Sequence, residues 1–364
     1  MKVSELYSYA PKSKIKAGQA KVEGEYQFFS SSADEHRRYD EYLYNAPAII
    51  MGTGGGATLH FYDGKFATST DCLVLLPNEK VIPKYLYYFF LGNFDILEAG
   101  FKGAGLKHTN KGYIDNIEIQ GLPNLSQQRK IVNLFDSLSK TINNKRSQID
   151  KLDNLIKARF VEMFGDPISN PHNWEKKSLS ELAEIRIGPF GSLLHKEDYI
   201  ENAHALVNPS HIIEGKIAVD LKLTVSNEKY EELSAYHLFI DDVVMGRRGE
   251  MGRCAVVTEN GLLCGTGSMI IRSNGILKAD FIQKIISFPS FKKTIEDMAV
   301  GQIMPNLNVP IVSNFMIICP PLEVQEQYYS FVEQIDKSKF AIKKSLEKTQ
   351  LLFGSLMQEY FSTN

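Results

Sequence analysis

Two long segments of the chain carry apolar residues at every third and fourth position, which is the spacing of an amphipathic helix. In residues 123–164 only Lys145 and Arg159 interrupt this pattern, and residues 322–364 keep it in the same phase. A heptad repeat of this kind predicts a long helix whose apolar seam packs against another helix. The expected seam positions are Ile131, Phe135, Leu138, Ile142, Ile149, Leu152, Ile156 and Met163 in the first segment, and Val332, Ile335, Ile342, Leu346, Phe353, Leu356 and Tyr360 in the second.

The two segments also match each other in sequence without an insertion. One constant offset aligns Leu125 with Leu322 and Gln128 with Gln325. Each predicted helix therefore finds a suitable partner in the other, and we expect the pair to pack antiparallel, with Ser126 as the N-cap of the first helix. The alternative is that each helix packs on the core of a separate domain.

The repeat continues outside the helices. The run "AIIMG", which ends at Gly52, matches "DVVMG", which ends at Gly246. Short apolar runs bounded by Gly, Asn and Asp, as in these regions, are typical of strands. We therefore expect an α+β fold, in which two homologous mixed α/β domains, residues 1–122 and 165–321, are separated by the two long helices of an antiparallel coiled coil.

A glycine-rich loop raises the question of phosphate binding. Residues 49–60 read "IIMGTGGGATLH", but no Gly-Lys-Ser/Thr sequence and no helical pattern follow the glycines, as a phosphate-binding loop requires. The matching stretch of the second copy carries Arg247, Arg248 and Glu250 instead. This exchange favours a β-hairpin turn, or a loop whose content varies because the two copies meet different partners. A nucleotide-binding enzyme that uses residues 52–56 is the alternative.

Composition and motifs narrow the chemistry. The net charge is −2, from 41 Lys and Arg against 43 Asp and Glu, so no global positive field indicates a nucleic-acid partner. The four cysteines form no C-x-x-C pair, and no G-x-S-x-G or H-E-x-x-H motif occurs. We expect no catalytic residue, metal or cofactor in this chain.

Hydropathy predicts no membrane span. The longest apolar runs, such as "YLYYFFL" and "FMII", are too short to cross a bilayer, and we expect a cytoplasmic protein. The aromatic residues of "KYLYYFFLG" follow one another continuously, and the second copy replaces several of them with aliphatics. That pattern favours a packed helix over a platform for stacked bases.

Taken together, the duplicated domains, the paired helices and their opening sequences resemble the specificity (S) subunit of Type I restriction–modification enzymes. The shared elements are "LPNLSQQRKI" and "PPLEVQEQ" at the two helix starts and "WEKKSLSELAEI" at the start of the second domain. Most specific is the pattern Pro-x-Leu-x-x-Gln, which ends at Gln128 and at Gln325. The resemblance covers essentially the whole chain.

This resemblance implies a noncatalytic subunit with two target recognition domains, residues 1–122 and 165–321. It also implies double-stranded DNA as the ligand, two modification subunits that carry S-adenosylmethionine and adenine-N6 methylation, and restriction subunits. A helix of about 39 residues is roughly 58 Å long, which is on the order of 1.5 turns of B-DNA. Two different recognition domains at a fixed separation would read a bipartite, asymmetric site.

Candidate DNA contacts are polar loop residues that differ between the copies. Arginine suits guanine, Asn and Gln suit adenine, and Lys more often contacts phosphate. These candidates are Ser30, Ser31, Ser32, Thr53, Lys102, Lys107, His108, Thr109 and Asn110 in the first domain, and Arg247, Arg248, Gln302, Asn306 and Asn308 in the second. A coiled-coil scaffold for protein partners, without a DNA role, is the other alternative.

Overall fold

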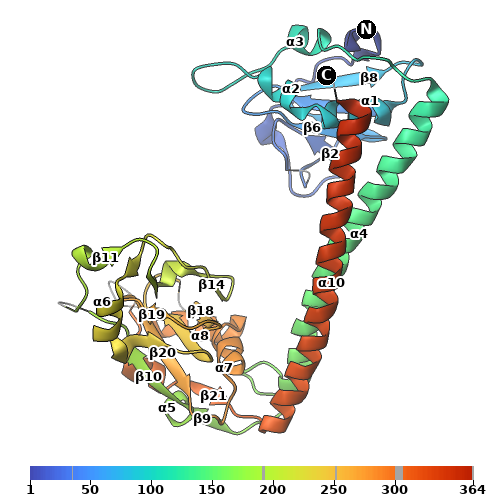
Figure 1. Ribbon diagram of the computed structural model, residues 1–364. Helices are drawn as coiled ribbons and strands as arrows, with labels where there is room; N and C mark the ends of the chain where they lie inside the picture. Colours follow the sequence, from blue (N-terminus) through green and yellow to red (C-terminus); the bar gives the residue numbers. More distant parts are fainter. Residues whose placement is uncertain (35, 191–192, 251, 300–305, 363–364) are drawn as a thin grey trace. The chain divides into compact units, whose positions relative to one another are not determined.

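The computed structural model describes residues 1–34, 36–190, 193–250, 252–299 and 306–362 (Figure 1). The chain divides into two compact units: unit 1 comprises residues 1–150 and 340–364, and unit 2 comprises residues 151–339. The long helices α4 (Leu125–Phe164) and α10 (Leu322–Phe361) each contribute one part to unit 1 and the other part to unit 2.

Unit 1 contains two four-stranded sheets and three short helices. Its elements are β1 (Tyr7–Tyr9), β2 (Tyr26–Phe29), β3 (Arg38–Tyr39), β4 (Tyr44–Asn45), β5 (Ala48–Gly52), β6 (Leu59–Tyr62), β7 (Lys65–Thr68), β8 (Cys72–Pro77), α1 (Pro83–Gly92), α2 (Phe94–Ala99) and α3 (Lys111–Asp115). One sheet has the order β1-β8-β5-β6 and is antiparallel throughout. The other has the order β3-β2-β7-β4, with β2 and β7 parallel.

The core of unit 1 lies between the first sheet, α1 and the long helices. Proline at the start of α1 suits the first helical turn, and the aromatic run that follows is buried, which confirms the predicted packed helix. The ring of Phe135 on α4 lies 5.2 Å from Tyr88 on α1 and 5.3 Å from Phe353 on α10. Aromatic side chains therefore join the sheet domain to both long helices.

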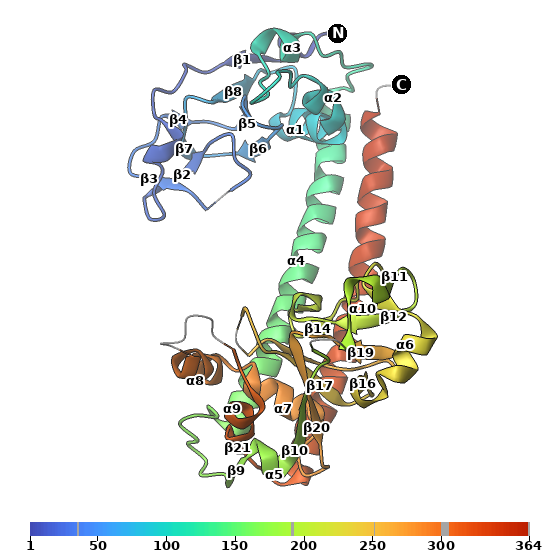
Figure 2. The ribbon, with the colours of Figure 1, turned by 90° about the vertical axis from the view of Figure 1, so that its left-hand side faces the viewer.

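Unit 2 is larger and adds strands to the same plan (Figure 2). Its elements are β9 (Lys176–Ser178), α5 (Leu179–Leu182), β10 (Ala183–Ile187), β11 (Tyr199–Ile200), β12 (His204–Val207), β13 (Ile212–Ile213), β14 (Lys216–Ile217), β15 (Thr224–Val225), α6 (Asn227–Glu232), β16 (His237–Leu238), β17 (Asp242–Gly246), β18 (Cys254–Val256), β19 (Leu262–Cys264), β20 (Ser268–Ser273), α7 (Ala279–Ile286), α8 (Pro289–Ala299), α9 (Val309–Ser313) and β21 (Met316–Ile318). Sheet order is β10-β20-β17-β18 in one sheet and β11-β15-β12-β19-β16 in the other, and β21 pairs with β9.

Strand order confirms that the two units are homologous. The antiparallel series β1-β8-β5-β6 of unit 1 corresponds to β10-β20-β17-β18 of unit 2. Each second sheet contains one parallel pair, β2 with β7 and β12 with β19. The matching sequences "AIIMG" and "DVVMG" form the equivalent buried strands β5 and β17, so the sequence repeat is a structural repeat.

Within each unit, α4 and α10 run antiparallel. In unit 1, Nζ of Lys145 donates to the hydroxyl oxygens of Ser345 and Thr349, both at 2.7 Å. In unit 2, Asp153 of α4 forms an ion pair with Lys339 of α10. In unit 1, Phe135 of α4 lies 5.3 Å from Phe353 of α10, whereas the later Lys145 contacts the earlier Ser345. In unit 2, Asp153 contacts Lys339, whereas the later Phe160 lies 5.6 Å from the earlier Tyr328. Within each unit, the two helices therefore have opposite directions. Polar residues that interrupt an apolar seam are known to specify its register.

The predicted seam positions lie mostly on the contacting faces. Ile131, Phe135 and Ile156 are buried, and Leu138, Ile142, Ile149, Leu152, Met163, Val332, Ile335, Ile342, Leu346, Phe353 and Leu356 are half-buried. Tyr360 departs from the expectation, because it is 41% exposed while its neighbour Phe361 is 4% exposed. The ring of Phe361 lies 5.3 Å from Tyr85 of α1 and 5.6 Å from Phe135. The last turn of α10 packs on α1 as well as on α4, which shifts its buried face by one residue.

The first long helix begins with a different cap from the one expected. Oδ1 of Asn124 accepts a hydrogen bond from the backbone N–H of Gln127 at 3.0 Å, and Oε1 of Gln127 accepts one from the N–H of Asn124 at 3.2 Å. This reciprocal pair is a capping box. Asn124 therefore replaces Ser126 as the N-cap, since the helix already starts at Leu125.

Candidate nucleic-acid interface

A hairpin carries the first group of candidate residues in unit 1. Residues 53–58 connect the antiparallel strands β5 and β6, and Gly55 has a φ of 89°, a conformation that glycine adopts readily. The N–H of Thr53 donates to the carbonyl of Asp71 at 2.8 Å. The hydroxyl of Ser31 donates to the same carbonyl at 2.9 Å. The loop that follows β2 is thereby tied to the hairpin.

A second loop lies against this hairpin. The N–H of Thr109 donates to the carbonyl of Thr53 at 3.1 Å, and the N–H of Gly55 donates to that of Lys107 at 2.9 Å. Nδ1 of His108 is 3.2 Å from the same Thr53 carbonyl. The residue after Thr109 is Asn110, whose side chain caps α3 by accepting from Tyr113. The structure thus brings residues 30–32, 53 and 107–110 together, although they are far apart in the sequence.

Not every candidate side chain in unit 1 faces solvent. Ser30 is 3% exposed and Thr109 is 9% exposed. Lys102, Lys107, His108 and Asn110 are exposed, and Ser31, Ser32 and Thr53 are half-buried. In this conformation, a ligand can therefore contact the exposed and the half-buried side chains directly, but not Ser30 or Thr109.

Sequence reasoning overlooked two cations beside this cluster. A cleft of about 260 Å³ is lined by Lys12 and Lys111 together with Thr53, Thr70 and Asn110. Nζ of Lys111 also lies 4.1 Å from the ring centre of Tyr9. The fold brings Lys12 and Lys111 close to the candidate residues. In the sequence, only the positive charge of these lysines could have indicated a role in DNA binding.

Unit 2 has an equivalent arrangement on the hairpin between β17 and β18. The N–H of Arg247 donates to the carbonyl of Gly267 at 2.9 Å, and the N–H of Leu307 donates to the carbonyl of Arg247 at 3.0 Å. Nε of Arg247 donates to the carbonyl of Leu307 at 3.0 Å. Burial is the main cause that lowers the pKa of the Arg247 guanidinium. This side chain is therefore partly committed to holding the neighbouring loop.

The remaining candidates of unit 2 differ in accessibility. Arg248 is exposed at the hairpin, and Asn306 is half-buried. Asn308 is exposed and caps α9 by accepting from the N–H of Ile311 at 3.0 Å. Gln302 lies outside the described residues.

Comparison of the two hairpins shows one backbone arrangement with different side chains. Thr53 and Arg247 each follow the glycine that ends the central strand, and the carbonyl of each accepts a hydrogen bond from the N–H of the residue before a capping asparagine. The capping residues, Asn110 and Asn308, are the same type. A conserved platform therefore presents threonine and glycines in unit 1 but arginines in unit 2.

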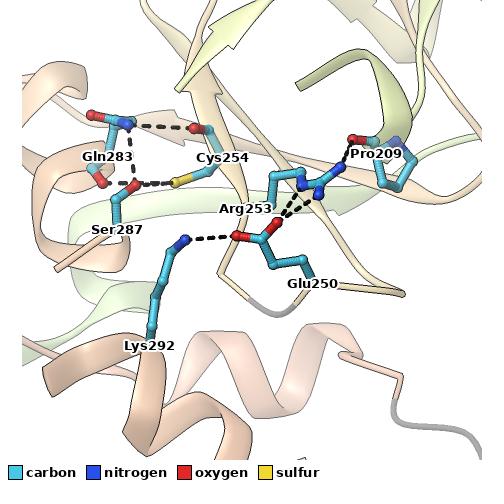
Figure 3. A network of polar contacts seen from close by, with 7 residues as sticks. All are labelled: Pro209, Glu250, Arg253, Cys254, Gln283, Ser287 and Lys292. Atoms are coloured by element: carbon cyan, nitrogen blue, oxygen red, sulfur yellow. Dashed lines mark hydrogen bonds and ion pairs between the residues drawn. The ribbon is translucent and has the colours of Figure 1, made fainter. Parts of the chain in front are cut away.

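The hairpin of unit 2 also contains a charged network (Figure 3). Oε2 of Glu250 accepts from Nη2 and Nε of Arg253 at 2.5 and 3.1 Å, and Oε1 accepts from Nζ of Lys292 at 3.0 Å. Hydrogen bonds from Arg253, followed by those from Lys292, hold the pKa of the Glu250 carboxyl below its usual value. Arg253 additionally donates to the carbonyl of Pro209 at 3.2 Å. Sequence reasoning missed Arg253 and Lys292.

A buried glutamine anchors each long helix to its unit. Oε1 of Gln128 accepts from the N–H of Ile82 at 2.7 Å, and its Nε2 donates to the carbonyl of Pro123 at 2.8 Å. A further bond of 3.3 Å reaches the carbonyl of Lys80. The sequence repeat singled out this glutamine as part of a signature, and the structure explains it as a side chain that satisfies backbone groups of two segments.

Gln325 makes the same three kinds of contact in unit 2. It accepts from the N–H of Lys278 at 3.0 Å and donates to the carbonyls of Pro320 and Ile276 at 2.9 and 3.3 Å. Like Gln128, it is fully buried. The agreement between the two networks supports the homology of the units at atomic detail.

The described residues also bear on metal binding and on membrane insertion. Among these residues, no group of three or more His, Cys, Asp or Glu side chains is arranged to hold a metal ion. No helix in the described ranges is both long enough and apolar enough to cross a membrane.

Comparison with known proteins relates this architecture to one family. A family model described as the Type I restriction modification DNA specificity domain matches residues 1–154 and 171–351. The chain belongs to this family. It is accordingly a DNA specificity subunit of a Type I restriction–modification system, a noncatalytic component that binds DNA and assembles with other subunits.

Individual relatives of the Type I specificity family agree. The specificity subunit of the Type I restriction enzyme MjaVIII from Methanocaldococcus jannaschii is 25% identical over 353 residues, which covers 87% of this chain and 80% of the relative. The MjaIX specificity subunit of the same organism is 23% identical over 326 residues, covering 78% and 72%. The crystal structure of an S subunit from M. genitalium has the same fold, with a TM-score of 0.64 at 16% identity, over 100% of this chain and 96% of that chain.

Family membership confirms the resemblance seen in the sequence and leaves the alternatives without support. The glycine loop at residues 53–58 is a hairpin connection between antiparallel strands, not a loop that leads into a helix. The two long helices carry domains of a DNA specificity family, which a scaffold without a DNA role would not need.

Proposed function

We propose that each unit of this Type I specificity subunit reads one half of a bipartite, asymmetric site in double-stranded DNA. The observation that carries the proposal is the repeated hairpin platform, in which Thr53 and Arg247 have equivalent backbone contacts but different chemistry. Two copies of one scaffold with different tips would recognise two different sequences. The recognition domains are residues 1–122 and 165–321.

The chemistry of the exposed candidates indicates which part of the DNA each would contact. Arg248 can pair with guanine through two parallel hydrogen bonds, whereas Lys102 and Lys107 suit phosphate oxygens. In Asn110 and Asn308 the cap uses Oδ1, so the Nδ2 donors are the part of each amide that a base can use. Gln302, Asn306, Ser31 and Ser32 remain candidates on the sequence argument alone, whereas Ser30 is buried.

The helices, residues 123–164 and 322–364, would set the spacer and receive the modification subunits. Phe340 and Leu351 of α10 are 68% and 74% exposed, and exposed apolar side chains of this size are typical of surfaces that bind other proteins. Two homologous units suggest two modification subunits, which would supply S-adenosylmethionine and adenine-N6 methylation. Restriction subunits would join the same complex, in the cytoplasm where the DNA lies.

An exchange of recognition domains tests the proposal. Residues 1–122 are replaced by the equivalent domain of a relative, the chain is expressed with its modification subunit, and methylated positions are mapped by methylation-sensitive long-read sequencing. One half of the methylated sequence should change, while the other half and the spacer stay the same.

The reciprocal exchange of residues 165–321 is the matched control and should change the other half only. A change in helix length should alter the spacer and preserve both halves. The proposal fails if a single exchange changes both halves, or if neither exchange changes the methylated sequence of an active complex.

A further inference from the structure

The charged network of the unit 2 hairpin has no counterpart in unit 1. Glu250 binds two cations at once, Arg253 from its own hairpin and Lys292 from α8 (Figure 3). The equivalent hairpin of unit 1, residues 53–58, reads "TGGGAT" and contains no charged side chain. That hairpin is held by backbone hydrogen bonds and by neutral side chains, such as the Thr58 hydroxyl, which accepts from the N–H of Gly52 at 3.0 Å. The shared hairpin fold therefore does not require the ion pairs.

The two cations of the network are also accessible to an anion from solvent. The side chains of Glu250, Arg253 and Lys292 are 49%, 33% and 29% exposed. A cleft of about 450 Å³ opens beside them and is lined in addition by Glu214, whose carboxylate is exposed, and by Gln283. Solvent ions can therefore reach the two cations without unfolding the hairpin.

Both cations are held in position by contacts other than Glu250. Nη1 of Arg253 donates to the Pro209 carbonyl, which leaves Nε and Nη2 as the pair that faces the carboxylate. The stem of Lys292 lies directly over the hairpin, since a Cβ placed on Gly252 would be 3.1 Å from Cγ of this lysine. The cations would keep this approximate placement if the carboxylate moved away.

We propose that Arg253 and Lys292 form a binding site for a phosphodiester of the DNA backbone, and that Glu250 occupies this site as an internal anion until DNA displaces it. A carboxylate and a phosphate present similar paired oxygens to an arginine fork. Glu250 would thus lower the affinity of this hairpin for any duplex, and leave discrimination to residues that contact bases. This inference rests on the proposed role of unit 2 in DNA recognition.

Substitution Glu250→Gln tests the inference in the complex reconstituted with the modification subunits. Glutamine keeps an oxygen that can accept from Arg253 and Lys292 but removes the charge. Affinity is measured by fluorescence anisotropy at several salt concentrations, on one duplex with the recognition sequence and one without it. We expect affinity for both duplexes to rise by about 3- to 10-fold, as for the removal of one nearby charge in partly screened surroundings. The slope of log affinity against log salt should steepen by about 0.9.

The matched control is Glu259→Gln, an exposed carboxylate of the same unit that lies outside the network. If Glu250→Gln changes affinity and salt slope no more than this control, the site is overturned. A gain that persists when Arg253→Gln or Lys292→Gln is added would overturn it too, because those cations are the proposed phosphate ligands. A lower melting temperature with unchanged affinity would show that the network serves only to hold the hairpin.

Failure of this inference can be told apart from failure of the proposed function. The methylated sequence of the Glu250→Gln complex is mapped by long-read sequencing alongside the affinity measurements. Both half-sites should remain unchanged whether or not Glu250 competes with phosphate. If domain exchange also leaves them unchanged, the proposed function fails, whatever the salt dependence shows.

Discussion

Gln325 offers the sharpest test of how the long helices are joined to the recognition domains. Its amide is fully buried and bridges the start of α10 to the segment before α7. The substitution Gln325→Ala removes this bridge and leaves the N–H of Lys278 and the carbonyl of Pro320 without their side-chain partner. We expect unit 2 to be destabilised although no seam residue changes.

The magnitude follows from the two best hydrogen bonds. Each buried polar group that loses its partner costs about 1–3 kcal/mol, so the loss of two partners should lower the free energy of unfolding by about 2–6 kcal/mol in total. The third contact, at 3.3 Å, involves the carbonyl of exposed Ile276, which water can satisfy. For a domain of this size, in which 1 kcal/mol shifts the melting temperature by about 2–4 °C, the change corresponds to roughly 4–24 °C.

The assay uses the single tryptophan of the chain. Trp174 lies in unit 2 and packs against its core, so intrinsic fluorescence during urea unfolding reports on this unit. Gln327→Ala is the matched control, because Gln327 has the same side chain two positions along α10 but is exposed. The control should leave the midpoint within the range of ordinary surface substitutions, about ±0.5 kcal/mol.

A second substitution separates hydrogen bonding from side-chain volume. Gln325→Glu keeps the acceptor for Lys278 but turns a carboxylate oxygen toward the carbonyls of Pro320 and Ile276, so it should be at least as destabilising as alanine at neutral pH. If Gln325→Ala matches the Gln327→Ala control, or if Gln325→Glu behaves as the unmodified chain, the buried amide does not anchor the helix.

Three further outcomes are expected. Ile149→Asp places a charge in the half-buried seam and should lower the free energy of unfolding by about 1–3 kcal/mol, measured by urea titration; an equal effect from Gln148→Asp, on the exposed face, would contradict this. Arg248→Ala should either relax preference at one base pair by about 1–3 kcal/mol or flatten the salt slope by about one phosphate contact, as measured by anisotropy. Burial raises the pKa of Cys254 to about 12. Alkylation at pH 8.5, measured by mass spectrometry, should therefore spare Cys254 and modify half-exposed Cys319. Because the pKa of Cys254 is higher in the folded state than in the unfolded state, the stability that its neutral thiol contributes should be lost as the pH rises from about 9 toward 12.

Much of the architecture was predictable because it depends on patterns along one dimension. A heptad requires only that apolar residues recur at a fixed spacing, and a repeat requires only that two segments match. Gln128 and Gln325 stood out for the same reason, since they occupy one position of both copies. Even the exchange of glycines for Arg247 and Arg248 correctly indicated a variable hairpin tip rather than a phosphate loop.

Local choices between neighbouring residues were less predictable. Asn124 and Ser126 are both good capping residues, and the path of the preceding chain decides that Asn124 takes the role. Phe361 is buried in place of Tyr360 because α1 lies beside the last turn of α10. A heptad describes packing against one partner, so it fails where a second element covers the helix.

The candidate interface shows the same division between sequence and tertiary structure. The sequence by itself determined that two homologous units carry different loops, since that follows from comparing the copies. Only the folded chain decided that Ser30 is buried, that Arg247 is tied to Leu307, and that Lys292 meets Glu250 across 42 positions of sequence. Such contacts depend on how sheets and helices pack in three dimensions. The spacing and composition of residues along the chain do not indicate which distant residues meet.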